Sequence, residues 1–289
     1  MTRAGPLRAT LLAGSDGLEA RHAALIAPGW RSRGGMMLAL GGVVALYAAG
    51  LAILDISPAR IAGGLGRLGD IAALMVPPTP ETWSRFQIYL AALGQTLSIA
   101  FLGTLTAALL ALPVGFLAAR NVVANRIVHL LTRRGLDTVR SVDTLVWALI
   151  WINVVGLGPF AGALAIMCAD FGAFGKLMSE AIETADRRPV EGVLSTGGGR
   201  LASIRFGVVP QVLPVFASQV LYFFESNTRS ATIIGIVGAG GIGLHLSELI
   251  RVLEWQQAAF VILMVLVTVA AIDAVSQRLR AAIIGRRAG

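Results

Sequence analysis

Four polar residues, Glu225, Asn227, Arg229 and Ser230, interrupt an apolar stretch at residues 211–236. Ionisable groups at membrane depth are expensive, and they usually face a charged partner or an aqueous cavity. The guanidinium of Arg229 presents a planar fork of donors that matches an oxyanion. A purely structural role is the alternative, because Glu225 and Arg229 are four residues apart on one helix face and could neutralise each other. These residues are therefore candidates for lining a path that carries an anion.

The rest of the sequence offers little for catalysis or metal binding. It has no Ser/His or HExxH arrangement, so we expect no catalytic residue and no intramembrane enzyme. His129 and His245 have no second ligand at metal spacing, and Cys168 is the only cysteine, so we expect no metal site. No GxxxxGK(S/T) motif occurs, so this chain itself should bind no ATP or other cofactor.

The longest polar insertion in the hydrophobic half of the chain is VEGVLSTGGGRLASIRFGVVPQVLP at residues 190–214. Residues 188–195 and 200–206 can each form a short helix. Gly197 and the two glycines after it can supply the backbone freedom for a sharp reversal between them. The pattern predicts a helix-turn-helix that projects from the rest of the chain, and an ordinary basic loop is the alternative.

The composition indicates what surrounds these motifs. Of the 289 residues, 56% are hydrophobic and only 14% are charged, and the mean hydropathy is +0.76, so the surface is expected to face lipid. A bilayer core of about 30 Å needs roughly 20 apolar residues per helix. We therefore predict an all-α membrane bundle of about six transmembrane helices. They are expected at residues 36–54, 89–119, 141–157, 159–182, 211–236 and 257–276.

The distribution of arginine predicts an orientation. The net charge is +8, but the arginines lie between apolar blocks and not on one amphipathic face, so we expect no nucleic-acid partner. With both termini in the cytoplasm, 18 arginines lie inside, and only Arg60, Arg67, Arg85 and Arg251 lie outside. Residues 1–35 are then a cytoplasmic arm, and residues 55–88 form an external loop with one surface helix.

The polar insertion resembles the EAA motif of permease subunits of ABC importers. Glu191 precedes Gly197 by six residues, Pro210 follows that glycine by thirteen, and Leu213 and Pro214 close the segment. Gly192, Val193 and Val209 depart from the usual residues of the motif. The resemblance implies a coupling helix, within residues 187–210, that docks on a separate ATPase subunit where ATP and Mg²⁺ are bound. The residues implicated are Arg188, Glu191, Gly197, Arg200, Pro210 and Pro214.

Three further segments are similar to the permeases of phosphonate-type ABC importers. They are RSVDTLVWALIW at 140–151, VGLGPFAGALAI at 155–166 and FFESNTRSATIIGIVGAGGIG at 223–243. The resemblance implies a type I importer core at residues 89–280, preceded by an extra helix and an external loop at 36–88 and followed by a cytoplasmic tail at 281–289. It also implies a bacterial inner-membrane location, ABC ATPase subunits, a second permease chain in a homodimer, and an external solute-binding protein.

The implied substrate is a phosphonate or a related phosphorus oxyanion. A permease for another small solute remains an alternative. An ion-coupled secondary carrier is a further one, but such a carrier has no need of a coupling helix.

Several residues are left with open roles. Asp143 stands where the family pattern has a proline, and it should either face the bundle interior or lie at the cytoplasmic end beside Arg140, which we favour. Lys176 is expected to pair locally with Glu180, four residues on. The glycines between residues 235 and 243 are expected to allow close helix packing and a helix break, at a gate or at the external end of the path.

Overall fold

A computed structural model describes residues 30–123 and 125–285, and within them every regular element is a helix, as predicted. The chain divides into two compact units, Met1–Asp70 and Ile71–Gly289. The predicted cytoplasmic arm at residues 1–29 and the last four residues of the tail lie outside the described residues.

The first unit contains α3 (Trp30–Ile53) and most of α4 (Pro58–Leu74). The segment Gly34–Ile53 of α3 is long and apolar enough to cross a membrane, and none of it is buried inside the protein. It corresponds to the first predicted span. The helix α4 is the helix expected in the loop at 55–88, and the hydroxyl of Ser57 accepts a hydrogen bond from the amide of Arg60 at its start.

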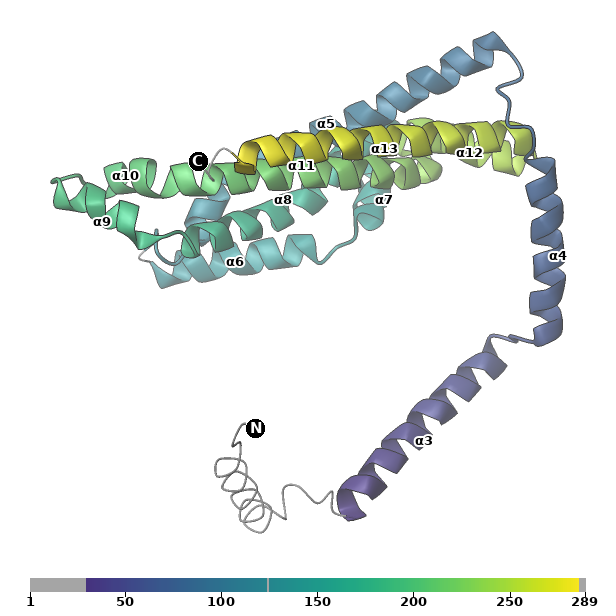
Figure 1. The fold of residues 1–289 in the computed structure, drawn as a ribbon, viewed down its shortest axis with the longest axis horizontal. Helices are drawn as coiled ribbons and strands as arrows, with labels where there is room; N and C mark the ends of the chain where they lie inside the picture. The colour runs from purple at the N-terminus through teal and green to yellow at the C-terminus, as the bar shows by residue number, and fades with distance from the viewer. Residues whose placement is uncertain (1–29, 124, 286–289) are drawn as a thin grey trace, which may run out of the picture. The chain divides into compact units, whose positions relative to one another are not determined.

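The second unit is a bundle built on α5 (Trp83–Ala118), α8 (Pro159–Glu183), α11 (Val209–Ile234) and α13 (Trp255–Gly285). Figure 1 shows α8, α11 and α13 running side by side. Small residues line the contact of α5 with α8: a Cβ on Gly115 would lie 2.6 Å from Met178. Small residues let membrane helices approach closely. Aromatic packing of Phe174 on Phe216 and Phe223 joins α8 to α11.

The length and composition of these four helices fit membrane spans, which confirms the predicted spans at 89–119, 159–182, 211–236 and 257–276. The helix α5 begins six residues before its predicted span, and α13 ends nine residues after its own. The third predicted span, 141–157, is wrong as a membrane span of one helix. The helix there is α7 (Thr144–Val155), whose 12 residues reach only about 18 Å. It meets α6 (Arg126–Arg140) at 87°, and the pair spans a membrane only as a bent unit.

Asp143 explains the break between α6 and α7. Its carboxylate accepts a hydrogen bond of 2.8 Å from the amide of Leu145, so it caps the N-terminus of α7. It lies three residues after Arg140, and both residues line one cavity. Helix capping is a role that neither sequence-based interpretation of Asp143 included.

Glycines break the chain after α11. A π-helical turn (Gly235–Ala239) leads to α12 (Ile242–Arg251), and Gly238, Gly240 and Gly241 have φ values of +103°, +79° and +77°. Residues with a Cβ rarely adopt such angles. The predicted helix break is therefore present, whereas a gate at this place stays a prediction.

Candidate functional site

The polar hairpin (residues 187–210) forms the end of the second unit. Its first arm is α9 (Arg187–Ser195), and its second arm is α10 (Arg200–Ser203), which continues through a π-helical turn (Ile204–Val208) into α11. Figure 1 shows α9 and α10 extending beyond the end of α13. The predicted second helix at 200–206 is therefore α-helical only to Ser203. The projecting helix-turn-helix is otherwise as predicted.

The turn of the polar hairpin requires glycine at two positions for different reasons. Gly197 has a φ of +87°, which L-residues with a side chain rarely adopt. The amide of Gly198 donates to the carbonyl of Val193 at 3.0 Å, and a Cβ on Gly198 would lie 2.7 Å from that oxygen. The backbone geometry thus fixes a tight reversal.

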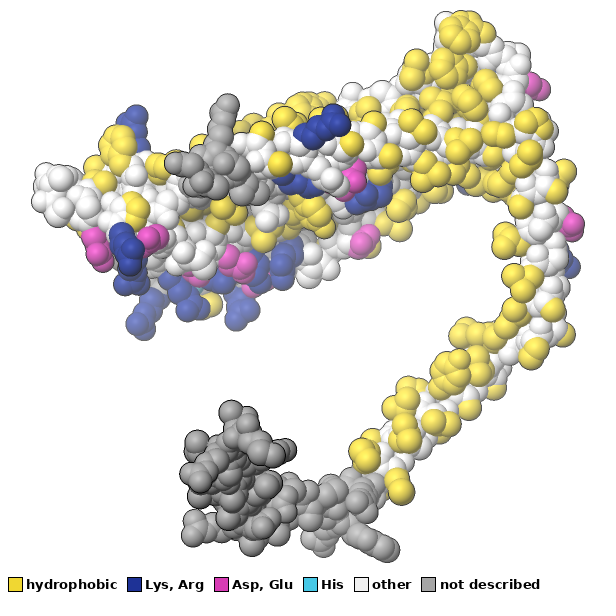
Figure 2. Space-filling model, in the orientation of Figure 1, with side chains coloured by type: hydrophobic (Ala, Val, Ile, Leu, Met, Phe, Trp, Pro, Cys, Tyr) yellow, Lys and Arg dark blue, Asp and Glu magenta, His cyan; other side chains and the backbone are white. Residues whose placement is uncertain are grey.

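The outer surface of the polar hairpin carries both charge and apolar groups. Arg188, Glu191 and Arg200 are exposed. Leu201 is 83% exposed, and Phe206, with the guanidinium of Arg205 5.4 Å from its ring centre, is also exposed. In Figure 2, charged side chains on the visible face gather toward this end of the second unit, whereas the opposite end is mainly hydrophobic. Exposed apolar residues next to charges are typical of a surface that meets another protein.

The polar hairpin is tied to α11 by Gln211, which the sequence analysis did not single out. The amide of Asp186 donates to Oε1 of Gln211 at 2.9 Å, and Nε2 of Gln211 donates to the carbonyl of Asp186 at 3.0 Å. Pro210 and Pro214 lie in α11 and not on the projecting arms. The polar hairpin is therefore continuous with α11, the helix that carries Glu225 and Arg229.

Glu225 is buried, and its carboxylate lies between two guanidinium groups. Arg280 of α13 is 3.2 Å away, and Arg229 is 3.6 Å away. Arg280 lies inside α13 and pairs with Glu225. The Arg229 side chain is 52% exposed, whereas that of Arg280 is 21% exposed. Arg229 is therefore the guanidinium of this cluster that can take a further acceptor.

Asn227 and Ser230 are less exposed than the side chain of Arg229. Asn227 is buried and donates to Oγ1 of Thr104 at 2.8 Å and to the carboxylate of Asp170. This network joins α11 to α5 and α8. Ser230 is half-buried and donates to the carbonyl of Ser226 at 3.4 Å. The role of both residues in a translocation path stays a prediction, and Asp170 is a partner that the sequence analysis did not identify.

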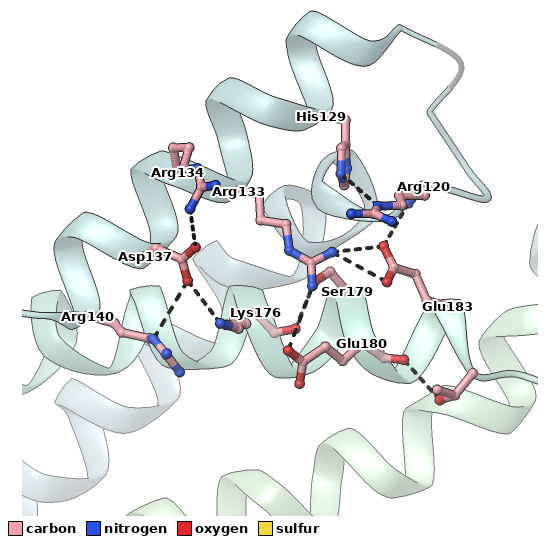
Figure 3. A network of polar contacts seen from close by, with 11 residues as sticks. Arg120, His129, Arg133, Arg134, Asp137, Arg140, Lys176, Ser179, Glu180 and Glu183 are labelled. Carbon is pink, nitrogen blue, oxygen red and sulfur yellow. Dashed lines mark hydrogen bonds and ion pairs between the residues drawn. The ribbon is translucent and has the colours of Figure 1, made fainter. Parts of the chain in front are cut away.

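A second set of ion pairs holds α6 against α8 (Figure 3). Lys176 contacts Asp137 of α6 at 3.0 Å, so the predicted pair with Glu180 is wrong. The packing of α6 on α8 brings the carboxylate of Asp137 to Lys176, whereas Glu180 of the same helix pairs with Arg133. Arg133 bridges Glu183 at 3.1 Å and Glu180 at 3.9 Å.

The polar clusters consist of ion pairs and hydrogen bonds within and between helices. Within residues 30–123 and 125–285, no three His, Cys, Asp or Glu residues come close enough to hold a metal ion. The buried carboxylate of Glu225 faces two cations and no nucleophile. The geometry therefore combines an exposed, projecting hairpin with a charged cluster inside a helix bundle.

Comparison with known proteins agrees with this geometry. Residues 111–288, more than half of the chain, match the family described as binding-protein-dependent transport system inner membrane component. The putative phosphite transport system permease protein HtxC of Stutzerimonas stutzeri is 38% identical over 82% of this chain and 83% of its own length. The phosphite transport system permease protein PtxC of the same organism is 34% identical over 87% of this chain and 90% of its own length. The phosphate-import permease protein PhnE of Mycolicibacterium smegmatis is 34% identical over 84% of this chain and 46% of its own length.

Solved structures share the fold. An inward-facing structure of the MetNI methionine ABC transporter matches with a TM-score of 0.61 and 16% identity, covering 70% of this chain and 99% of the other. A crystal structure of an amino acid ABC transporter with histidines matches with a TM-score of 0.59 and 14% identity, covering 69% and 95%. These likenesses place the helix bundle among importer permeases by fold.

Proposed function

Because this chain belongs to the family of inner-membrane components of binding-protein-dependent transport systems, we propose that it forms the translocation path for a phosphorus oxyanion such as phosphite, phosphate or a phosphonate. The chain is a multi-pass permease subunit of an ABC importer and not an enzyme. Two phosphite permeases and one phosphate-import permease among its relatives support this substrate class.

The chemistry of Arg229 supports an anionic substrate. Its half-exposed guanidinium retains donors that Glu225 does not occupy, since Glu225 has a nearer partner in Arg280. A guanidinium binds a tetrahedral oxyanion through parallel charge-assisted hydrogen bonds. A permease for another small solute is the second candidate, and the relatives named for phosphite and phosphate favour the first.

The polar hairpin supports the proposal that ATP hydrolysis takes place on another subunit. It projects from the bundle, exposes Leu201 and Phe206 on its second arm, and is joined through Gln211 to the helix that bears Arg229. We infer that it docks on an ABC ATPase, which binds ATP and Mg²⁺. An ion-coupled carrier has no ATPase partner and therefore needs no such hairpin.

The complete assembly would contain two copies of this permease, two ATPase subunits and an external solute-binding protein. The chain would lie in a bacterial inner membrane with both termini in the cytoplasm, as the positions of its arginines favour. The polar hairpin would then lie on the cytoplasmic side, where an ATPase has access to it.

A photo-crosslink tests the docking. In the complex purified from membranes, p-benzoylphenylalanine in place of Leu201 should give a covalent adduct with the ATPase subunit, because this side chain is 83% exposed at the hairpin. The adduct is identified by mass spectrometry.

A matched control carries the same replacement at Val252, which is exposed at the turn between α12 and α13. That position should give no ATPase adduct. Equal adducts at both positions, or none at Leu201 in an intact complex, would contradict the docking.

A further inference from the structure

An open cavity of about 540 Å³ lies at the junction of α5 and α6, apart from the Arg229 cluster. Its lining residues are Arg120, Val123, Arg126, His129 and Leu130. The first follows the end of α5 by two residues, and the last three belong to the first turns of α6. The cavity therefore lies at the end of a membrane span and combines three basic side chains with apolar ones.

Neither guanidinium group of this cavity makes a hydrogen bond or ion pair with a carboxylate among the described residues. Nε of Arg120 donates to Nε2 of His129 at 3.3 Å, and Arg126 makes no side-chain hydrogen bond or ion pair within residues 30–123 and 125–285. The nearby carboxylate of Glu183 accepts from Arg133 and from the backbone amide of Arg120. Both guanidinium groups therefore retain donors for an external acceptor.

Helix stability does not account for a cation at Arg126. This residue is the first of α6, and a positive charge at a helix N-terminus opposes the helix dipole. His129 holds the first arginine in place, because its Nε2 accepts from Nε of Arg120, while its Nδ1 is buried. The two guanidinium groups therefore offer the donors that suit an anion.

The apolar residues beside the cavity distinguish a lipid from a free ion. Leu130 lines the cavity, and Ile127 and Leu131 are exposed on the same helix within one turn of it. An inorganic oxyanion would use the basic side chains and leave these three side chains in water. A phospholipid would use both, since its phosphate suits the arginines and its acyl chain suits exposed leucine and isoleucine.

We propose that this cavity binds an anionic phospholipid, with the headgroup phosphate at Arg120 and Arg126 and an acyl chain along Ile127, Leu130 and Leu131. With the proposed orientation, the lipid belongs to the cytoplasmic leaflet. The lipid would contact α6, and the backbone amide of Arg120 beside it donates to Glu183, a member of the ion pairs of Figure 3 that hold α6 against α8.

Native mass spectrometry of the full chain in detergent tests this site. Phosphatidylglycerol should be retained over phosphatidylcholine of the same acyl chains by at least about fivefold, because each arginine at an anionic headgroup adds attraction. In Arg120→Gln with Arg126→Gln, this preference should fall to near parity. Arg251→Gln removes one positive charge, as Arg126→Gln alone does, but from an exposed site at the end of α12, and it should keep the preference.

Two outcomes would overturn the proposal. One is an unchanged preference for phosphatidylglycerol in the double variant. The other is complete displacement of the lipid by excess inorganic phosphate, which would make the cavity a site for a free oxyanion. Arg126→Gln alone guards against misfolding, because this exposed side chain has no partner in the described residues, and it should lower the preference by itself.

Discussion

Replacing Arg229 by glutamine is expected to reduce transport by about ten- to a hundredfold, which corresponds to the loss of about 1.5–3 kcal/mol from a hydrogen bond to a charged group. The substitution removes a guanidinium that is 52% exposed and whose contact with Glu225, at 3.6 Å, is the longer of the two. Assembly and basal ATP hydrolysis should be preserved, because the carboxylate of Glu225 retains Arg280. Uptake and complex yield are measured on the same membranes.

Arg280→Gln is the matched control for Arg229→Gln, since it removes the same charge from the same carboxylate. Arg280 is largely buried and contacts Glu225 at 3.2 Å, so its loss should lower expression and thermal stability more than transport per assembled complex. The assignment of Arg229 to the path is wrong if both variants behave alike. It is also wrong if Glu225→Gln combined with Arg229→Gln restores both expression and transport, because the pair would then only balance charge.

The contrast between Arg229 and Arg280 shows what the sequence could and could not predict. The spacing of Glu225 and Arg229 within one helix is local, so their contact was predictable. The contact with Arg280 joins residues 55 positions apart and depends on how α11 packs against α13. For the same reason Lys176 pairs with Asp137 of α6, although Glu180 has the favourable spacing on its own helix.

Local chemistry also explains which elements were predicted well. Apolar length identified four spans of the second unit, because a bilayer demands it. The turn at Gly197 was predictable because a run of three glycines favours a reversal. The helix in the third predicted span is too short to cross a membrane alone, because Asp143 caps the start of α7 and separates it from α6. In the sequence, a carboxylate that caps a helix is hard to distinguish from a charge at the membrane surface.

Replacing Gly197 by valine is expected to uncouple the transporter. A β-branched residue at a φ of +87° costs of the order of 1–3 kcal/mol, so the turn should change shape and displace Leu201 and Phe206. The chain should still insert in the membrane, because the spans are unchanged. Stimulation of ATP hydrolysis by loaded binding protein should fall to the basal rate, and uptake should be lost.

Gly199→Val provides the comparison for the turn. Gly199 has a φ of −73°, and a Cβ there would meet nothing within 4 Å, so valine should fit. This variant should keep most of the stimulated ATP hydrolysis. Normal transport by Gly197→Val would remove the main support for coupling through the polar hairpin.

ATP-driven import of a phosphorus oxyanion is tested most directly by uptake of radiolabelled phosphite into proteoliposomes. These proteoliposomes contain the chain, the ATPase subunits that purify with it and the solute-binding protein. We expect accumulation only with ATP on the side of the polar hairpin and with the binding protein on the other side, and we expect unlabelled phosphonate or phosphate to compete whereas sulfate does not. Uptake that persists without the ATPase and follows a proton or sodium gradient would contradict the account.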